Sequence, residues 1–455
     1  MSRIRVVLAV AFLLGAMLPA GVLAAQTSPS PLRLGYCGGD DWEPTLAQSG
    51  RLIVAAITHY QGDPTCDPAS ASPQAIYIQT STDGGAHWTA PHAAWTGPLD
   101  GVTYPRQADP SLAIDASGNV YLAFLGYGLN GGHTDVVVAK SSDGGATFST
   151  AAKTNAKDCK NCDHEKLVAA PSGLYVAYSQ AANHFIALST DGGSTWTQST
   201  VLKADVVAFA EGGVVDAHGN VVFAWADCQS SSCSGSPAVD YRVSRTAPGT
   251  LATSFVVVGT AVQGPDCPFS SCGFAYWSPQ DAIGIDAAGT LYLAAGQGQS
   301  STTRKSPPIV NLFSSADGGA TWTALGRVDD KDASGCADSA CYALFPTVIG
   351  GSAGQVSVAW MDDRAGSPID HMNGWNVWLR SSSDGGVSWT GPSVKVSGYD
   401  PSQAQEQPNG FLFPYGDYMG MGINRCGAPM LVWGEGPDWV GGASHPGHVE
   451  FRSMC

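Results

Sequence analysis

The chain has 455 residues, a formal net charge of −16 at pH 7, a charged fraction of only 13% and 56 glycines. Binding to DNA, RNA or anionic membranes requires a basic surface, so the acidic balance argues against these as the main partners. Few charges and many small residues favour a turn-rich all-β protein with short strands.

The chain begins in the order of a secretory signal peptide. Arg3 and Arg5 precede an apolar run over residues 6–23, which small residues follow. A membrane anchor is the alternative, and no later stretch is apolar enough to span a bilayer. We therefore expect a signal peptide over residues 1–25 and a secreted or periplasmic protein. Removing the two arginines changes the formal charge from −16 to −18, because the segment holds no acid.

The 12 cysteines of an exported chain indicate disulfide bonds. The local pairs are Cys159/Cys162, Cys228/Cys233, Cys267/Cys272 and Cys336/Cys341, and the remaining cysteines are Cys37, Cys66, Cys426 and Cys455. A metal or redox motif is the alternative for the Cys-x-x-Cys pair at Cys159. A zinc site of that kind needs a second cysteine pair at suitable spacing, which the sequence lacks.

A turn motif, S-x-D-x-G-x-x-W/F, recurs five times along the chain, each time after a short β-prone run. The copies are Ser81–Trp88, Ser141–Phe148, Ser189–Trp196, Ser315–Trp322 and Ser382–Trp389. In a tight hairpin turn the Asp accepts backbone N–H bonds, the Gly adopts an angle that other residues resist, and the aromatic ring packs beneath. Each copy therefore marks the end of one repeated β unit.

Between these motifs lies a second repeated element, an apolar hairpin with a glycine in its turn. In chain order the hairpins are Thr45–Ile57, Ser111–Phe124, Leu167–Tyr178, Gly213–Trp225, Ala282–Ala295, Thr347–Trp360 and Tyr418–Trp433. The turn glycines are too far apart for units of two strands and suit units of four. Each unit is then a hairpin A–B, a connecting loop and a hairpin C–D that the motif closes.

Seven four-stranded units in series predict a seven-bladed β-propeller, a single domain over residues 26–455 in which radial repetition protects the strand edges. The fourth unit has Ser244-Arg245-Thr246 in place of the motif and is expected to be degenerate. After the seventh hairpin only one strand, His448–Arg452, fits before the chain ends. We expect the N-terminal run Pro31–Tyr36 to supply the missing strand and close the ring.

This topology also predicts two longer disulfide bonds. If strand A descends from the top face, the A–B turn and the end of strand C both lie at the bottom, so Cys426 and Cys455 can meet. The D–A and B–C loops both lie at the top, which lets Cys37 reach Cys66. Either pair requires a Cα separation below about 7 Å.

The repeated motif resembles the Asp box of the sialidase-like propellers, which are also called BNR-repeat proteins. The last third of the chain, from Val358–Arg364 through Asn376–Trp378 to Phe413–Gly420, is similar to secreted bacterial members of this superfamily. The resemblance implies the propeller fold. It implies no particular activity, because the family's Asp box lies at the outer edge of the ring, in enzymes and binding proteins alike.

Sialidases proper are expected to show six blades, an Arg-Ile-Pro motif, three arginines for the sugar carboxylate, a Tyr nucleophile paired with Glu, and an Asp acid/base. Three guanidinium groups hold a carboxylate in fixed geometry, and a neutral Tyr avoids repulsion from the anionic sugar. This chain departs from that pattern with seven units and no Arg-Ile-Pro, for which Tyr104-Pro105-Arg106 is the nearest substitute.

The D–A and B–C loops converge over the central channel and are expected to carry the site. The candidate catalytic residues are Tyr415, Asp417, Asp109 and Asp363, and the candidate substrate-binding residues are Arg106, Arg304, Arg364, Trp42 and Trp277. Tyr415 begins the last blade, where the resemblance implies the nucleophile, and the arginines are candidates for a carboxylate clamp.

Each candidate also has a structural interpretation. Arg364 can pair with Asp362 or Asp363, Tyr415 can cap a strand, and Asp109 can bind backbone N–H groups. Asp109, Glu43 and Asp281 are the alternative carboxylates for ordinary glycoside hydrolysis.

The sequence thus favours a secreted carbohydrate-active propeller, a glycoside hydrolase of exo-α-sialidase type that acts on a carbohydrate or glycoprotein glycan as a monomer. The alternatives are a non-catalytic glycan- or protein-binding propeller and a polysaccharide lyase in which His164 beside Glu165 is the base. No catalytic metal is expected. A structural calcium ion at Asp329, Asp330 and Asp332 is left open, with solvation of these carboxylates as the alternative.

Overall fold

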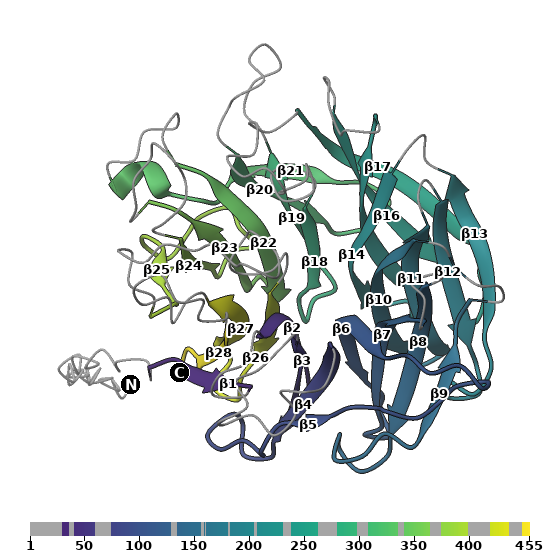
Figure 1. Cartoon of the computed structure of the whole chain (residues 1–455). Coiled ribbons are helices and arrows are strands. Elements are labelled where there is room, and N and C mark those ends of the chain that lie inside the picture. Colours follow the sequence, from purple (N-terminus) through teal and green to yellow (C-terminus); the bar gives the residue numbers. More distant parts are fainter. Residues whose placement is uncertain are drawn as a thin grey trace, which may run out of the picture.

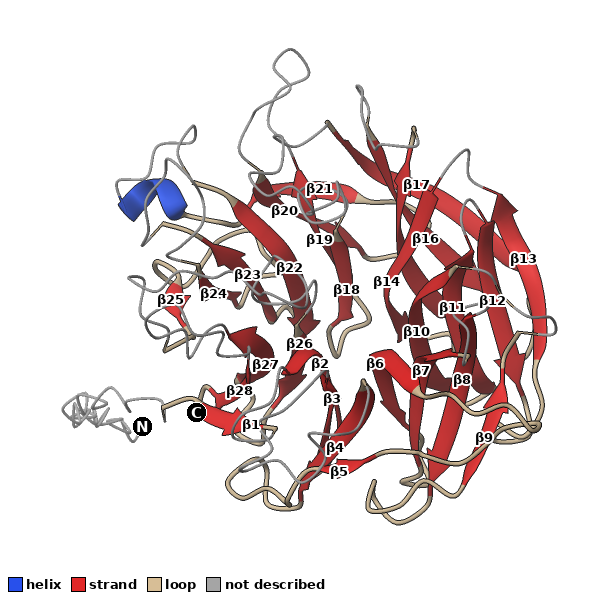
Figure 2. Cartoon of the chain, viewed as in Figure 1, coloured by secondary structure: helices blue, strands red, loops and turns tan. Residues whose placement is uncertain are grey.

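A computed structural model describes residues 30–35, 41–59, 74–128, 134–155, 159, 161–180, 183–203, 207–230, 238–262, 280–297, 308–334, 341–364, 375–398, 419–435 and 448–455. Over these ranges the strands form seven four-stranded antiparallel sheets, which are arranged as blades around an axis (Figure 1). The predicted seven-bladed propeller is therefore confirmed. Figure 2 shows that the described elements are almost all strands, with one 3-10 turn, η2 (Lys331–Ser334).

The first six blades each follow the chain from the innermost strand A to the outermost strand D. Blade 1 is β2 (Asp41–Ser49), β3 (Leu52–His59), β4 (Ala75–Ser81) and β5 (His92–Ala93); blade 2 is β6 (Arg106–Ile114), β7 (Val120–Tyr127), β8 (Thr134–Ser141) and β9 (Thr150–Lys153); blade 3 is β10 (Cys162–Ala170), β11 (Gly173–Gln180), β12 (Asn183–Ser189) and β13 (Thr197–Lys203).

The second half of the ring repeats this order up to the seventh blade. Blade 4 is β14 (Val207–Val215), β15 (Val221–Cys228), β16 (Val239–Thr246) and β17 (Thr253–Ala261); blade 5 is β18 (Asp281–Ile285), β19 (Leu291–Gln297), β20 (Ile309–Ser315) and β21 (Thr323–Arg327); blade 6 is β22 (Ala343–Gly350), β23 (Val356–Asp362), β24 (Asn376–Ser382) and β25 (Val394–Lys395). Blade 4 has all four strands although it lacks the Asp box, so the expected degenerate unit is confirmed.

The cores lie between neighbouring blades. In β15, Val222 and Ala224 pack toward blade 5, while Phe223 and Trp225 pack toward blade 3. Successive side chains of a strand point to opposite faces, and here both faces are covered. This explains why the middle strands are continuous apolar runs. Among the described helices, none is long and apolar enough to cross a membrane.

The N-terminal strand closes the ring, as predicted. β1 (Leu32–Leu34) pairs with β28 (His448–Ser453), and the blade continues through β27 (Pro429–Glu435) to β26 (Gly420–Ile423). Figure 1 shows the purple β1 beside the yellow β28. In this register Leu34 lies opposite Val449 and joins the core between blades 7 and 1.

The predicted bond between Cys426 and Cys455 is also confirmed, with Cα atoms 6.2 Å apart. Cys159 and Cys162 form a disulfide, which excludes the alternative of a free metal-binding pair there. Cys228 and Cys341 are disulfide-bonded as well. The predicted bond between Cys37 and Cys66 and the signal peptide over residues 1–25 lie outside the described residues.

The Asp-box turns have the geometry that the motif predicts. In the first copy, Asp83 Oδ1 accepts from the backbone N of Ala86 and of His87, both at 3.0 Å. Gly85 adopts a φ of 96° and donates its N–H to Ser81 Oγ at 2.8 Å. The turns close the C–D hairpins, on the side of the ring opposite to the D–A and B–C loops.

Candidate functional site

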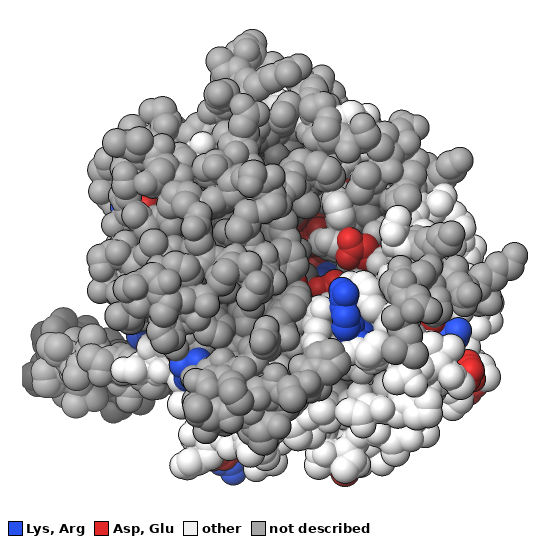
Figure 3. All heavy atoms as spheres, viewed as in Figure 1, with Lys and Arg blue, Asp and Glu red and all other residues white. Residues whose placement is uncertain are grey.

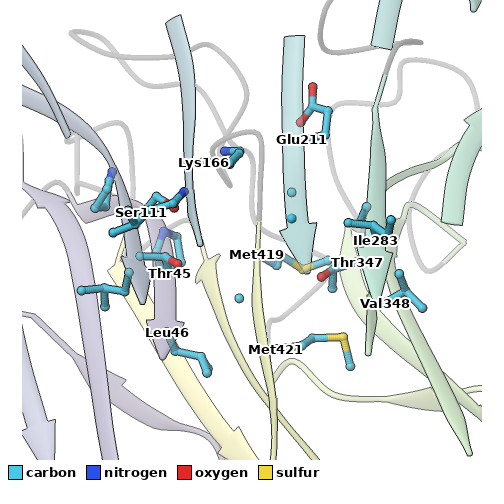
Figure 4. Close-up of a pocket in the computed structure, with 18 residues that line it drawn as sticks. Thr45, Leu46, Ser111, Lys166, Glu211, Ile283, Thr347, Val348, Met419 and Met421 are labelled. Atoms are coloured by element: carbon cyan, nitrogen blue, oxygen red, sulfur yellow. The ribbon is translucent and has the colours of Figure 1, made fainter. Parts of the chain in front are cut away.

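The seven innermost strands surround a cavity of about 210 Å³ on the axis of the ring. Figure 4 shows Lys166 and Glu211 at one end of the cavity and Leu46 and Met421 at the other. The larger apolar side chains that line it are Leu46, Leu112, Leu167, Ile283, Val348, Met419 and Met421. The cavity therefore has a charged upper end and an apolar floor.

A β-bulge recurs near the top of the innermost strands. The pairing of strands A and B shifts after Trp42, Ala108, Asp163, Ala210 and Leu344. In four of these bulges a non-glycine residue adopts positive φ, namely Glu43 at 52°, Asp109 at 59°, His164 at 55° and Phe345 at 52°. This backbone region is costly for such residues and is often found where a bulge re-aims side chains at a functional site.

Acidic side chains near the top of the innermost strands of blades 1 to 5 form two groups, and Glu211 of the second group lines the cavity. Glu43, Asp109, Asp163 and Glu165 act electrostatically on Tyr127, whereas Glu211 and Asp281 act on Tyr241. We call these six residues the acidic ring. Figure 3 shows acidic atoms in a hollow near the middle of this face, with basic atoms beside them.

Two carboxyl groups of the acidic ring favour the protonated form. Glu165 is 1% exposed, and burial, followed by the charge of Asp109, raises its pKa well above the usual value. Asp281 is 3% exposed, and burial, followed by the charge of Glu211, does the same to its pKa. None of their four carboxyl oxygens has a hydrogen-bond partner, so each is available for a hydrogen bond with a bound molecule.

The ring is balanced by a few cationic and aromatic groups. His164 Nδ1 lies 3.5 Å from Glu211 Oε1 and joins the two halves of the acidic ring. The Lys166 charge acts on Asp163 and Glu165 and lowers the pKa of both, against the larger effect of burial. Burial and the surrounding carboxylates raise the pKa of Tyr127, so its hydroxyl remains a hydrogen-bond donor.

Two residues predicted from the sequence lie at this site. Asp109 belongs to the acidic ring and donates its backbone N–H to Thr58 Oγ1 at 3.1 Å. The exposed Arg106 guanidinium lies 5.2 Å from the ring centre of Tyr127. Both belong to β6, Arg106 at its first residue and Asp109 within its bulge.

Three other predicted residues lie in different surroundings. Trp42 is 0% exposed, and its ring therefore has no free face for a sugar. Asp363 is buried and accepts the backbone N–H of Tyr342 at 2.7 Å, which fixes the start of blade 6. Arg364 is 4% exposed and pairs with Asp362 at 2.6 Å and with Asp330 at 3.0 Å.

The pairing of Arg364 confirms the structural interpretation of this residue. Its guanidinium also stacks over Trp378 at 4.0 Å and donates to Ser393 Oγ at 3.1 Å. With its donors used in this way, Arg364 is not available for a carboxylate clamp in the axial site. Tyr415, Asp417, Arg304 and Trp277 lie outside the described residues.

The carboxylates considered for a calcium ion are engaged by cations of the chain. Arg327 pairs with Asp329 at 2.7 Å and with Asp332 at 2.7 Å. The buried Lys331 lies 3.8 Å from Asp329 Oδ1, and Asp330 binds Arg364 and Ser393. These contacts account for the acidic run as an ion-pair network at the outer part of blades 5 and 6.

Sequence reasoning missed Glu211, Lys166 and Tyr127 as site residues and did not commit to Glu165 or Asp281. The sequence does contain a partial signal for the level of the site. Glu43-Pro44, Asp109-Pro110 and Phe345-Pro346 share a proline at the same point of strand A, where each first residue has positive φ. This repeated dipeptide marks the bulges and so the level at which the acidic ring lies.

The comparisons with known proteins agree with the fold. Residues 42–235 match the BNR repeat-like domain. No curated protein matches the chain significantly. An ulvan lyase, a polysaccharide lyase, shares 11% identity and a TM-score of 0.52, over 92% of this chain and 95% of that one.

Two further structures are similar over nearly their whole length. A Dyadobacter fermentans protein of unknown function shares 11% identity and a TM-score of 0.49, over 94% of this chain and 99% of that one. The intramolecular trans-sialidase of Ruminococcus gnavus shares 13% identity and a TM-score of 0.46, over 94% and 97%. At these identities the likeness concerns the fold alone. Residues 42–235, which hold three of the five Asp-box turns, thus match the BNR repeat-like domain, and the ring of blades has the propeller fold of these structures.

Proposed function

We propose that the protein is a secreted enzyme that cleaves glycosidic bonds at the charged end of the axial cavity. The observation that carries the proposal is Glu165, a buried carboxyl group whose protonated form is favoured by burial and then by the charge of Asp109. A carboxyl group kept protonated by its environment is the usual general acid of glycoside hydrolysis. Glu165 is the general acid in this proposal.

The charge of the site favours a neutral glycan over a sialoside or another acidic sugar. A carboxylate substrate would meet the acidic ring, which Lys166, Arg106 and His164 balance only in part. Arg364 is already paired with Asp362 and Asp330, so the clamp expected for an exo-α-sialidase lacks one of its candidates. Burial of Glu165 and Asp281 strengthens their interactions with a bound sugar.

A polysaccharide lyase is the second candidate, because Tyr127 and His164, two possible proton-transferring groups, adjoin the same ring. The ulvan lyase whose fold is similar is by name such an enzyme. A lyase leaves an unsaturated sugar that absorbs in the ultraviolet, whereas a hydrolase leaves only a new reducing end. The product therefore separates the two reactions.

The test is a screen of the purified protein on neutral oligosaccharides, sialosides and uronate polysaccharides, followed by Glu165→Gln. We expect cleavage of a neutral glycan, and a loss of about 10²–10⁴-fold in kcat for the variant, because the amide cannot donate the acid's proton.

Asp100→Asn is the control, since Asp100 is exposed and Asn tolerates its φ of 52°. An unchanged rate for Glu165→Gln would refute the proposed acid. Binding without cleavage of any substrate would make the protein a glycan-binding propeller instead.

The pH profile gives an independent check. Because the folded pKa of Glu165 is raised, the acid stays protonated into a higher pH range and activity should fall as the pH rises through that pKa. The residual activity of Glu165→Gln should not show this step. A wild-type rate that instead rises throughout the alkaline range would exclude a general acid of this kind.

A further inference from the structure

The geometry points to a second site, in the closing blade, that we propose binds one divalent transition-metal cation such as Zn²⁺ or Mn²⁺ through Glu435, His448 and Glu450. Glu435 ends β27 and lies directly opposite His448, the first residue of β28. Glu450 follows two residues later and so projects from the same face of the blade.

The three side chains converge closely enough to share one ion. One ligand atom from each lies within 4.8 Å of the other two. His448 Nε2 is 3.1 Å from Glu450 Oε1 and 3.9 Å from Glu435 Oε2. Metal bonds of about 2.0–2.2 Å place neighbouring tetrahedral ligand atoms roughly 3.3 Å apart. Small side-chain rotations would therefore complete the geometry, and a water would occupy the fourth position.

The site also contains an unsatisfied buried acceptor. Glu450 is 9% exposed, and its Oε2 is buried with no hydrogen-bond partner. A buried carboxylate oxygen without a partner is costly, and a bound cation would remove that cost. With neutral His448 the three ligands carry two negative charges, which a divalent cation balances. Arg33 of β1, the cross-strand neighbour of Glu450, is the cation of the chain that competes for this role.

The ligand types select the metal class. One imidazole nitrogen and two carboxylates suit Zn²⁺ or Mn²⁺, whereas Ca²⁺ and Mg²⁺ prefer oxygen ligands alone. None of the three proposed ligands lines the axial cavity. They lie on the face of blade 7 that packs against blade 6, where Trp433 joins the core of the interface and Arg452 donates to Val396 O at 2.7 Å. The proposal therefore does not depend on the enzymatic one.

The position gives the ion a role in ring closure. The metal would join β27 to β28 at the top of blade 7, while the Cys426–Cys455 bond joins the A–B turn to the end of β28 at the bottom. β28 carries β1, so both links hold the strand through which the two ends of the described chain meet. A bound ion should then raise thermal stability by mass action.

The experiment starts from full-length mature protein stripped with a chelator. Zn²⁺, Mn²⁺, Ca²⁺ and Mg²⁺ are each added, while stoichiometry is measured by calorimetry and stability by thermal unfolding. We expect one Zn²⁺ or Mn²⁺ per chain and a rise in Tm of about 2–5 °C. His448→Gln and Glu450→Gln should each abolish both effects, and His218→Gln, at an exposed histidine, should abolish neither.

Two results would overturn the proposal. One is that no ion binds and chelation leaves Tm unchanged, in which case the cluster is an ion triad around protonated His448. The other is that His448→Gln and Glu450→Gln still bind one ion each, which would place the metal elsewhere. If one variant fails to fold, the other decides, since each replaces one strong metal ligand by a neutral amide of similar size.

Discussion

At the scale of single residues, the Asp boxes and the acidic ring place carboxyl groups in opposite environments. Asp317 is exposed and accepts hydrogen bonds from Thr321 Oγ1 at 2.5 Å, from the Thr321 N–H at 2.9 Å and from Ser315 Oγ at 2.8 Å. These bonds stabilise its charged form and lower its pKa to about 2. Glu165 is buried without such bonds, and its charged form is disfavoured. The boxes therefore serve stability, while the ring is available for chemistry.

This contrast predicts a stability maximum at mildly acidic pH. Hydrogen bonds chiefly from Thr or Ser side chains lower the pKa to about 2 in Asp143, Asp191, Asp317 and Asp384. Unfolded Asp has a pKa of about 3.9, so their stabilisation is complete above this pH and is lost as the pH falls toward 2. The folded-state pKa values of Glu165 and Asp281 are raised, so protonation of these two residues favours the folded state. The stability of the protein should therefore increase as the pH falls from the alkaline side.

Thermal midpoints recorded from about pH 3 to pH 9 would measure this profile. The double variant Glu165→Gln/Asp281→Asn should flatten its alkaline side and leave the acid side unchanged. The variant Asp317→Ala should lower the midpoint at neutral pH and lose part of the acid-side dependence. A wild-type midpoint that rises continuously to alkaline pH would contradict the assigned sign for the buried pair.

At the scale of elements, the sequence predicted what is encoded locally and missed what depends on assembly. The Ser, Asp and Gly of each box interact within one turn, so five turns and their strands follow from the sequence. The environment of Glu165 depends on Asp109 from the neighbouring blade, which no local pattern reports. Arg364 shows both cases: its local partner Asp362 was named from the sequence, whereas its other partner Asp330, 34 residues away in the preceding blade, was not.

The closing strand gives a prediction at this scale. Leu34 is 1% exposed between blades 7 and 1, whereas Leu32, on the same three-residue strand, is 42% exposed. Leu34→Ala should destabilise the protein by about 2–5 kcal/mol in denaturant unfolding, through lost burial and a cavity. Leu32→Ala is the matched control and should change stability by less than about 0.5 kcal/mol. Equal effects of the two substitutions would show that β1 is not held in this register.

At the scale of the whole molecule, ring closure brings the two ends of the described chain into one sheet. β1 and β28 are far apart in sequence, and blade 7 is the only blade of the ring formed from both ends. The loss of its pairing would leave β28 as an exposed edge, which invites aggregation. Closure therefore depends on three links in blade 7: the β1 pairing, the Cys426–Cys455 bond and the proposed metal site.

The disulfide link can be tested on the complete ring. Cys426 and Cys455 enclose a loop with a sequence separation of 29 residues. In the chain-entropy model a loop of this length is worth about 3–4 kcal/mol, because the bond restricts the unfolded chain. The double variant Cys426→Ser/Cys455→Ser should lose stability of this order in urea unfolding under non-reducing conditions. It should retain the proposed glycan cleavage at low temperature, because the bond lies at the bottom face, away from the acidic ring. Loss of activity in a variant that is still folded would show that closure at the bottom shapes the axial cavity. An unchanged urea midpoint would show that blade 7 is not where unfolding begins.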